Sequence, residues 1–131
     1  MIHYSHNISI APGLFIDVLE RSGLRRPVND VARIAAMLTH ANLIVTAWED
    51  VTLVGVSRAL TDFSYCCYLS DLAVDKAYQK QGIGRRLIEE THHHAGVHTS
   101  LILLSVPDAM SYYSHIGMEK IENGFVIQRI G

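Results

Sequence analysis

The sequence predicts an α/β (α+β) fold in which helices flank one mixed, mostly antiparallel sheet with a central parallel pair of strands. The chain has 131 residues, the length of one domain (1–131), and 49% of them are apolar, which is enough for a substantial core. Strand-like and helical runs follow one another with no linker or internal repeat. In the middle of the chain a strand-like run, a helical pattern and an aliphatic run form a βαβ unit, which makes its two strands parallel.

Proline, glycine and polar caps mark the elements of the first half of the chain. Proline suits the first turn of a helix, glycine the position after its end, and asparagine the N-cap. The elements expected there are a strand at 2–10, a helix opened by Pro12 and ended by Gly23, a helix capped by Asn29, and two strands at 43–48 and 52–60 around Glu49-Asp50.

The second half contains the βαβ unit and a hairpin signal. The elements expected there are a long strand at 65–74, a helix at 84–94, a strand at 101–106, a short helix from Pro107 to Ser114 ended by Gly117, and two short strands around Asn123-Gly124. The run at 101–106 is aliphatic throughout, which is typical of a strand buried on both faces. Asn-Gly is a strong hairpin signal. The predicted order is β-α-α-β-β-β-α-β-α-β-β.

Composition and charge exclude several classes of protein. The net charge is −2 and no basic block is present, which argues against nucleic acid as the main partner. The apolar run 101–104 is far too short to cross a membrane, and the N-terminus does not resemble a signal peptide. Cys66 and Cys67 are neighbours in a strand and point to opposite faces, so they cannot bridge each other or ligate one metal. Reduced thiols of this kind fit a cytoplasmic protein.

The stretch that joins the strand 65–74 to the next helix contains two glycines, Gly82 and Gly84. A strand that turns into a helix points several backbone N–H groups at one spot, and the helix dipole adds positive potential there. Glycine allows a ligand to approach this backbone closely. The stretch therefore predicts an anion-binding site.

Two arginines, Arg85 and Arg86, occupy the first turn of the same helix, where their charges oppose the dipole. A bound polyanion would explain them. The alternative interpretation pairs each arginine with the glutamate four residues later, Glu89 or Glu90.

The two common nucleotide motifs do not fit this stretch. Leu87 stands where the third glycine of a dinucleotide fingerprint belongs, and no acidic residue follows at the required distance. The Gly-Lys-Ser/Thr of a P-loop is absent as well.

The spacing Gln79-x-x-Gly82-x-Gly84, after Leu69-Ser70-Asp71-Leu72-Ala73-Val74, resembles the acetyl-CoA pyrophosphate loop and fourth strand of the GCN5-related N-acetyltransferases, the GNAT family. The resemblance implies a GNAT fold, whose element order matches the predicted one along almost the whole chain. It also implies acetyl-CoA as cosubstrate, with no metal. It assigns cofactor binding to the main chain of Leu72, Ala73 and Val74 and to Gln79, Lys80, Gln81, Gly82, Ile83, Gly84, Arg85 and Arg86.

A second motif, Ala109-Met110-Ser111-Tyr112-Tyr113-Ser114-His115-Ile116-Gly117-Met118, resembles the late A-x-x-F-Y-x-x-x-G-F signature of the family. The resemblance implies that Tyr113 is the general acid that protonates the departing CoA thiolate. A hydroxyl group that donates to a thiolate makes it a better leaving group. Tyr112 is expected to be a core aromatic residue, and a core position is the alternative for Tyr113.

An amine attacks only when it is neutral, so a base is expected. Many family members use a glutamate near the position of Tyr68, which is not a carboxylate here. Asp71 is the nearest candidate, because strand alternation places it on one face with Cys67, Leu69 and Ala73. The alternative is that Asp71 caps backbone groups or pairs with a neighbouring cation, and a β-bulge would reverse the argument about faces. Asp62 and His115 are weaker candidates.

The histidines at 92–94 and His98 suggest a metal site only superficially. Consecutive helical residues point about 100° apart, so three in a row cannot converge on one ion. Histidines also suit the end of a helix, where the dipole is negative.

Together these features predict transfer of an acetyl group from acetyl-CoA to a primary amine of a small molecule or peptide, by direct attack in a ternary complex. The alternative is a non-catalytic acyl-CoA-binding sensor, which the missing strand glutamate favours. A nucleotide-binding domain is a weaker third interpretation. The expected partners are acetyl-CoA and an amine acceptor, with neither nucleic acid nor membrane, and the apolar sheet edge of the fold suggests a homodimer.

Overall fold

The computed structural model describes residues 1–131 and contains one five-stranded sheet with the order β1-β2-β3-β4-β5. The strands are β1 (Ile2–His6), β2 (Leu43–Glu49), β3 (Thr52–Thr61), β4 (Cys66–Val74) and β5 (Ser100–Leu103). Neighbouring strands from β1 to β4 are antiparallel, and β4 and β5 are parallel. The helices are α1 (Pro12–Ser22), α2 (Val31–His40), α3 (Ile83–Ala95) and α4 (Met110–His115).

The helix ends follow the local signals closely. Pro12 lies at the start of α1, and Gly23 after its end has φ +82°, in the left-handed region that glycine adopts without strain. The cap of α2 is Asp30, one residue after the predicted Asn29, and its side chain accepts a hydrogen bond from the Arg33 N–H at 3.1 Å.

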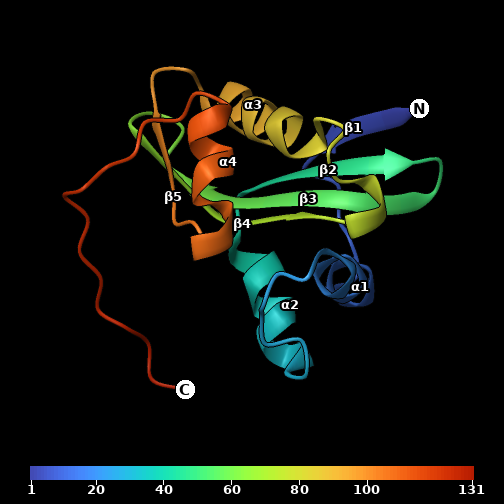
Figure 1. Ribbon diagram of the computed structural model, residues 1–131. Helices are drawn as coiled ribbons and strands as arrows, with labels where there is room; N and C mark the ends of the chain where they lie inside the picture. The colour runs from blue at the N-terminus through green and yellow to red at the C-terminus, as the bar shows by residue number, and fades with distance from the viewer.

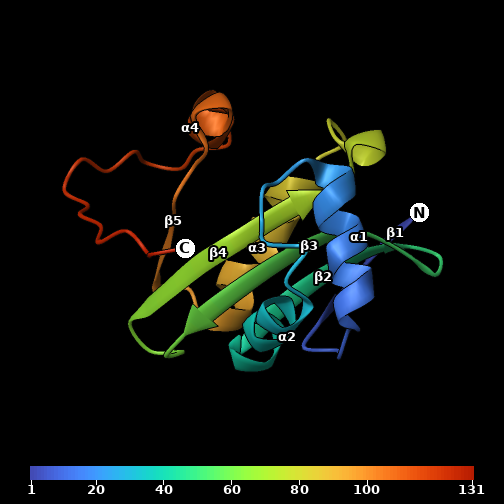
Figure 2. The ribbon, with the colours of Figure 1, turned by 90° about the horizontal axis from the view of Figure 1, so that it is seen from below.

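The helices cover both faces of the sheet (Figure 1). Helices α1 and α2 lie on one face and α3 on the other, and the view from below shows α1 and α2 in front of the strands (Figure 2). Phe15, Leu19 and Ile34 anchor the core under α1 and α2. Leu43, Val45 and Leu87 belong to the core under α3. The sheet is therefore sandwiched between two apolar layers.

A β-bulge in β4 corrects the predicted facing of Asp71. Arg58 of β3 pairs with Asp71 and the next residue, Ala59, pairs with Leu69, so Ser70 is an extra residue in β4. One inserted residue reverses the alternation beyond it. Cys67 therefore packs in the core under α3, whereas Ala73, two residues after Asp71, packs under α1 and α2. The prediction that Asp71 shares a face with Cys67 and Leu69 is wrong, and its association with Ala73 is right.

The C-terminal part differs from the prediction. Residues 118–131 contain no strand, so the two short strands expected around Asn123-Gly124 are absent (Figure 1). A two-stranded hairpin without a sheet to join is only marginally stable. Without these strands, β5 is the edge strand of the sheet. It is not buried on both faces as expected, and the side chain of Ile102 is 43% exposed. The parallel pair lies at the end of the sheet and not at its centre.

None of the four helices has the length and apolar character needed to cross a membrane. The longest, α3, has 13 residues.

Candidate functional site

The segment between β4 and α3 follows a well-defined path along the end of the sheet. The Gln79 side-chain amide donates to the Val74 carbonyl at 3.0 Å, which ties the segment to the last residue of β4. Lys80 (φ +66°) and Gly82 (φ +82°) then turn the chain through the left-handed region, and α3 begins at Ile83. We call residues 79–84 the amide loop.

The amide loop exposes a run of free hydrogen-bond donors. The backbone N–H groups of the five residues from Lys80 to Gly84 donate no hydrogen bond within the chain. The last two of them belong to the first turn of α3, where N–H groups have no intrahelical acceptor and the dipole is positive. A Cβ placed on Gly82 would meet no atom within 4 Å, so the outer side of the loop is open. Adjacent free amides with positive potential have the geometry of an anion site.

Tyr112 forms one wall of this loop, which the sequence did not predict. The Tyr112 hydroxyl lies 2.8 Å from the position that a Cβ on Gly84 would take, so only glycine allows this approach. Burial raises the pKa of Tyr112, while a hydrogen bond from the Arg85 backbone N–H acts in the opposite direction. Tyr112 is 38% exposed and is therefore not the core residue that was expected.

The two arginines that follow the loop have different surroundings. The Arg86 guanidinium pairs with Glu90 at 3.1 Å and lies over the Tyr4 ring at 4.6 Å, as the pairing interpretation expects. Arg85 forms no ion pair, and its side chain is exposed. Only Arg85 therefore has its charge free for a ligand at the start of α3.

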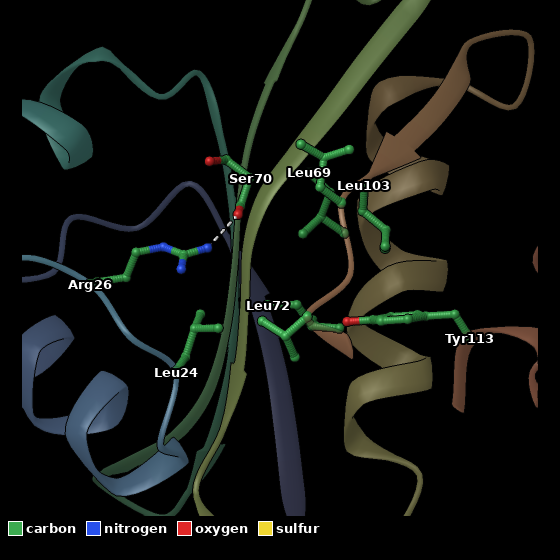
Figure 3. Close-up of a pocket in the computed structure, with 9 residues that line it drawn as sticks. Leu24, Arg26, Leu69, Ser70, Leu72, Leu103 and Tyr113 are labelled. Atoms are coloured by element: carbon green, nitrogen blue, oxygen red, sulfur yellow. Dashed lines mark hydrogen bonds between the residues drawn. The ribbon is translucent and has the colours of Figure 1, made fainter. Parts of the chain in front are cut away.

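A cleft opens where β4 and β5 separate (Figure 3). Their pairing ends at Leu69 and Leu103, while β4 continues to Val74. The Asp75 N–H donates to Val54 of β3, so by alternation the N–H and C=O of Leu72 point to the open side. Leu72 and Val74 are half-buried, and Ala73 is buried in the core under α1 and α2. Backbone groups at this end of β4 are thus accessible from the cleft.

Tyr113 points from α4 towards β4 across this cleft (Figure 3). It lines a small cavity of about 40 Å3 together with Leu72 and Leu103. Burial, and to a lesser degree the neighbouring Tyr112, raise the pKa of Tyr113. The hydroxyl therefore stays protonated at neutral pH and acts as a hydrogen-bond donor.

Asp71 lies on the opposite side of β4 and is fully buried. One carboxylate oxygen accepts from Arg26 Nε and the other from Arg58 Nε. Arg26 also donates to the Ser70 carbonyl at 3.0 Å (Figure 3), and Arg58 to the Ser70 hydroxyl at 3.0 Å. This arrangement supports the alternative of pairing with neighbouring cations, because each oxygen is engaged by an arginine and the side chain is fully buried.

The other titratable groups take structural positions. Asp62 accepts three backbone hydrogen bonds, from Ser64, Tyr65 and Cys66, and so holds the turn between β3 and β4. His94 stacks on His6 with 3.7 Å between ring centroids. No group of three or more His, Cys, Asp or Glu side chains is arranged to hold a metal ion.

Comparison with known protein families identifies the family to which this chain belongs. The family model described as "Acetyltransferase (GNAT) domain" matches residues 19–130. The chain belongs to the GNAT acetyltransferase family. The predicted family is confirmed, and acetyl transfer is its general activity. A search of curated proteins finds no match.

Solved structures share the fold of this GNAT domain at low sequence identity. A protein of unknown function from meticillin-resistant Staphylococcus aureus, named a probable acetyltransferase, has a TM-score of 0.81 at 20% identity and covers 98% of this chain and 100% of its own. A GNAT family acetyltransferase from Streptococcus pneumoniae has a TM-score of 0.71 at 21% identity, over 99% and 100%. An aminoglycoside N-acetyltransferase in complex with CoA has a TM-score of 0.75 at 12% identity, over 98% and 95%. The predicted fold class is confirmed.

The sequence did not predict the roles of three side chains that shape the site of this GNAT domain: Tyr112, Arg26 and Arg58. Arg58 carried a usable signal, because a lone charge in the apolar strand 52–60 needs a buried partner. Arg26 lies in the segment between α1 and α2, where no local pattern indicates a contact with β4.

Proposed function

We propose that this protein transfers an acetyl group from acetyl-CoA to a primary amine of a small molecule or peptide, by direct attack in a ternary complex. The observation that carries this proposal is the amide loop: its five adjacent free N–H groups lie beside Tyr112, the chain neighbour of the Tyr113 that lines the cleft. A thioester cofactor with a diphosphate needs these two features side by side.

The diphosphate would be held by the amide loop. The amides from Lys80 to Gly84 would donate to its oxygens, and Arg85 would add a positive charge. Gln79 would shape the loop through its bond to Val74, and Tyr112 would form the wall. Ile83 would contribute its amide only, because its side chain is 3% exposed and packs in the core.

The thioester would lie in the cleft beside the end of β4. The free N–H of Leu72 would donate to the thioester carbonyl, and the backbone of Val74 would align the pantetheine arm. Ala73, whose backbone pairs with β3, would act only by holding this end of β4 in place. The neutral amine attacks the carbonyl carbon, the oxyanion of the tetrahedral intermediate is stabilised by that N–H, and the C–S bond then breaks. Tyr113 would donate to the sulfur as it leaves as a thiolate.

The proton released by the amine requires a separate acceptor. Because both oxygens of Asp71 are already paired with arginines, we assign this role to water in the open cleft. Asp71 would instead hold Arg26, and with it the α1–α2 segment, against β4.

The test is release of free CoA thiol from acetyl-CoA with a panel of amines. We expect turnover with at least one amine, and we expect Tyr113→Phe to lower kcat roughly 10²-fold or more, the range for loss of a general acid. The affinity of Tyr113→Phe for CoA should stay unchanged, because the hydroxyl acts only on the leaving sulfur. Normal turnover by Tyr113→Phe would contradict its role.

A non-catalytic acyl-CoA sensor remains the second candidate function, favoured by the lack of a free carboxylate on β4. The two candidates separate in the same assay. Tight acetyl-CoA binding without thiol release with any amine would support the sensor.

We also propose that the protein works as a homodimer in the cytoplasm. The exposed edge of β5 supports the dimer. The two free cysteines support a reducing compartment. The net charge of −2 supports an amine acceptor as the partner in place of nucleic acid.

A further inference from the structure

The face of the sheet that carries α1 and α2 is left open over the first part of β4. Figure 2, in which these helices lie in front of the strands, shows no helix in front of the part of β4 that follows the turn from β3. Cys67 packs in the core under α3, so the side chain of its neighbour Tyr68 points to the open face. Tyr68 is accordingly 41% exposed.

Three large apolar side chains lie next to one another on this open face. Tyr68 is opposite Leu60 of β3 and opposite Ile102 of β5, and directly opposite residues of neighbouring strands are close enough to contact. Leu60 is 42% exposed and Ile102 43%. We call Leu60, Tyr68 and Ile102 the apolar row. A contiguous row of this kind differs from the single hydrophobic residues scattered over an ordinary surface, and it indicates a binding surface.

The apolar row leads to the cavity that Tyr113 lines. Leu104, just after β5, lies two residues beyond Ile102, a span of about 7 Å in an extended chain. Leu104 is 70% exposed and lines this cavity as well. Figure 3 shows Leu24 and Arg26 on one side of β4 and Tyr113 on the other, and all three line the cavity. The cavity therefore lies between the proposed thioester position and the face that carries the row.

The charges along this path do not suit a polycation. Arg26 is the one charged side chain among those that line the cavity, and the apolar row contains no acidic residue. The Asp71 carboxylate is already shared by Arg26 and Arg58, which leaves two guanidinium groups to one carboxylate. A substrate that keeps further ammonium groups would be repelled here, whereas an amine that loses its single positive charge before it attacks is not.

We propose that the apolar row binds the body of the acceptor, and that the acceptor is a monoamine with an aromatic or long aliphatic body. This inference rests on the proposed acetyl transfer and names the class of amine that it uses. The amino group would enter the cavity, and the body would run past Leu104 onto Ile102 and Tyr68. Because Ile102 is about 7 Å from Leu104 along the chain, several carbons must separate an aromatic ring from the amine.

The first experiment compares acceptors by the release of CoA thiol from acetyl-CoA. The probes are n-butylamine, 4-phenylbutylamine, spermidine and the aminoglycoside kanamycin. We expect kcat/KM for 4-phenylbutylamine to exceed that for n-butylamine roughly 10-fold or more, because the ring is removed from water on the row. A higher kcat/KM for spermidine or kanamycin than for 4-phenylbutylamine would overturn the proposal.

The second experiment measures how variants of the row change the ratio of kcat/KM for 4-phenylbutylamine to that for n-butylamine. Tyr68→Ser and Ile102→Ser should each lower this ratio roughly 3- to 10-fold, and Tyr68→Phe should keep it because the ring remains. Val51→Ser is the matched control, since Val51 is 90% exposed in the β2–β3 turn, and it should keep the ratio too. A thermal shift with CoA verifies that each variant is folded.

An unchanged ratio in both serine variants would overturn the proposal. Light scattering identifies the other occupant of such a surface, a second copy of the chain. If Tyr68→Ser changed the mass in solution and kept the ratio, the row would be a protein interface and the proposal would be wrong.

Calorimetric titration of the CoA complex with 4-phenylbutylamine separates this inference from the proposed function. Binding that is weakened by Tyr68→Ser, without thiol release from acetyl-CoA, would overturn the proposed function alone. Thiol release with an amine whose kcat/KM ignores both serine variants would overturn the acceptor class alone. Neither binding nor release with any amine would overturn both.

Discussion

Asp71 is tightly held, because it is fully buried with a guanidinium on each oxygen. Its partners are also sheltered, with side chains that are 25% exposed for Arg26 and 9% for Arg58. Removing one partner of a buried ion pair leaves the other charge unpaired in a low-dielectric environment, which is costly. The residue is thus better suited to holding the α1–α2 segment on β4 than to exchanging protons.

Asp71→Asn should lower the free energy of unfolding by about 3 kcal/mol, since two arginines lose their counter-charge. Urea unfolding at pH 7 measures this loss. Asp17→Asn, the same change at an exposed position of α1, should leave the stability unchanged. If Asp71→Asn were as stable as the unmodified protein but catalytically dead, the carboxylate would be a base after all.

Arg85 and Arg86 form a natural matched pair, because they are adjacent and identical but differ in their partners. Arg85→Ala should raise the Kd for CoA roughly 3- to 10-fold, the loss of one partly solvated charge contact, and the effect should shrink at high salt. Arg86→Ala should change the Kd less than about 2-fold, because Arg86 is already engaged by Glu90 and Tyr4. Titration calorimetry at two salt concentrations tests both, and equal losses would show that Arg86 turns to the ligand.

At the scale of single elements, the turn between β3 and β4 depends on one side chain. Asp62 accepts three backbone N–H groups, from Tyr65, Cys66 and Ser64, which lower its pKa to about 2. Phe63 in the same turn has φ +59°, a strained conformation for an aromatic residue that these bonds help to hold.

A carboxylate whose pKa is lowered on folding stabilises the protein above its unfolded pKa, near 4, and this stabilisation is lost as the pH falls towards 2. The Tm should therefore fall between about pH 4 and pH 2, and Asp62→Asn should show a smaller fall because it carries no charge to lose. Calorimetry across this range tests the prediction. An unchanged slope in Asp62→Asn would mean that other carboxylates cause the acid sensitivity, and Asp17→Asn serves as the control.

The amide loop and α3 act as one element in binding. The loop is positioned by the Gln79 bond to β4, and α3 is anchored by buried Ile83 and Leu87. The donors are therefore already in place before a ligand arrives, which reduces the entropy lost on binding.

At the scale of the whole molecule, CoA binding should stabilise the fold through this loop. A ligand at 100 times its Kd adds about 2.7 kcal/mol to the free energy of unfolding, enough to raise the Tm by several degrees. Pantetheine, which lacks the diphosphate, should give a much smaller shift at the same concentration. A thermal-shift comparison that includes ATP and NAD tests this, and equal shifts for CoA and pantetheine would locate the binding energy elsewhere.

The sequence by itself determined the features that depend on neighbours in the chain. Pro12 and Gly23 delimit α1 because φ preferences act on single residues, and the spacing of Gly82 and Gly84 predicts a strand–turn–helix with free amides for the same reason. These local signals, with the motif around Tyr113, were enough for the family and the order of elements up to α4.

Only the tertiary structure decided the features that depend on contacts between distant segments. One extra residue in β4, Ser70, turns Asp71 towards Arg26 and Arg58, and no local pattern distinguishes a bulged strand from a regular one. Tyr112 reaches Gly84 across the fold, and β5 lies at the edge because the Asn123-Gly124 segment does not pack on it. An apolar run shows that a strand prefers burial, but its position in the sheet depends on which partner covers it.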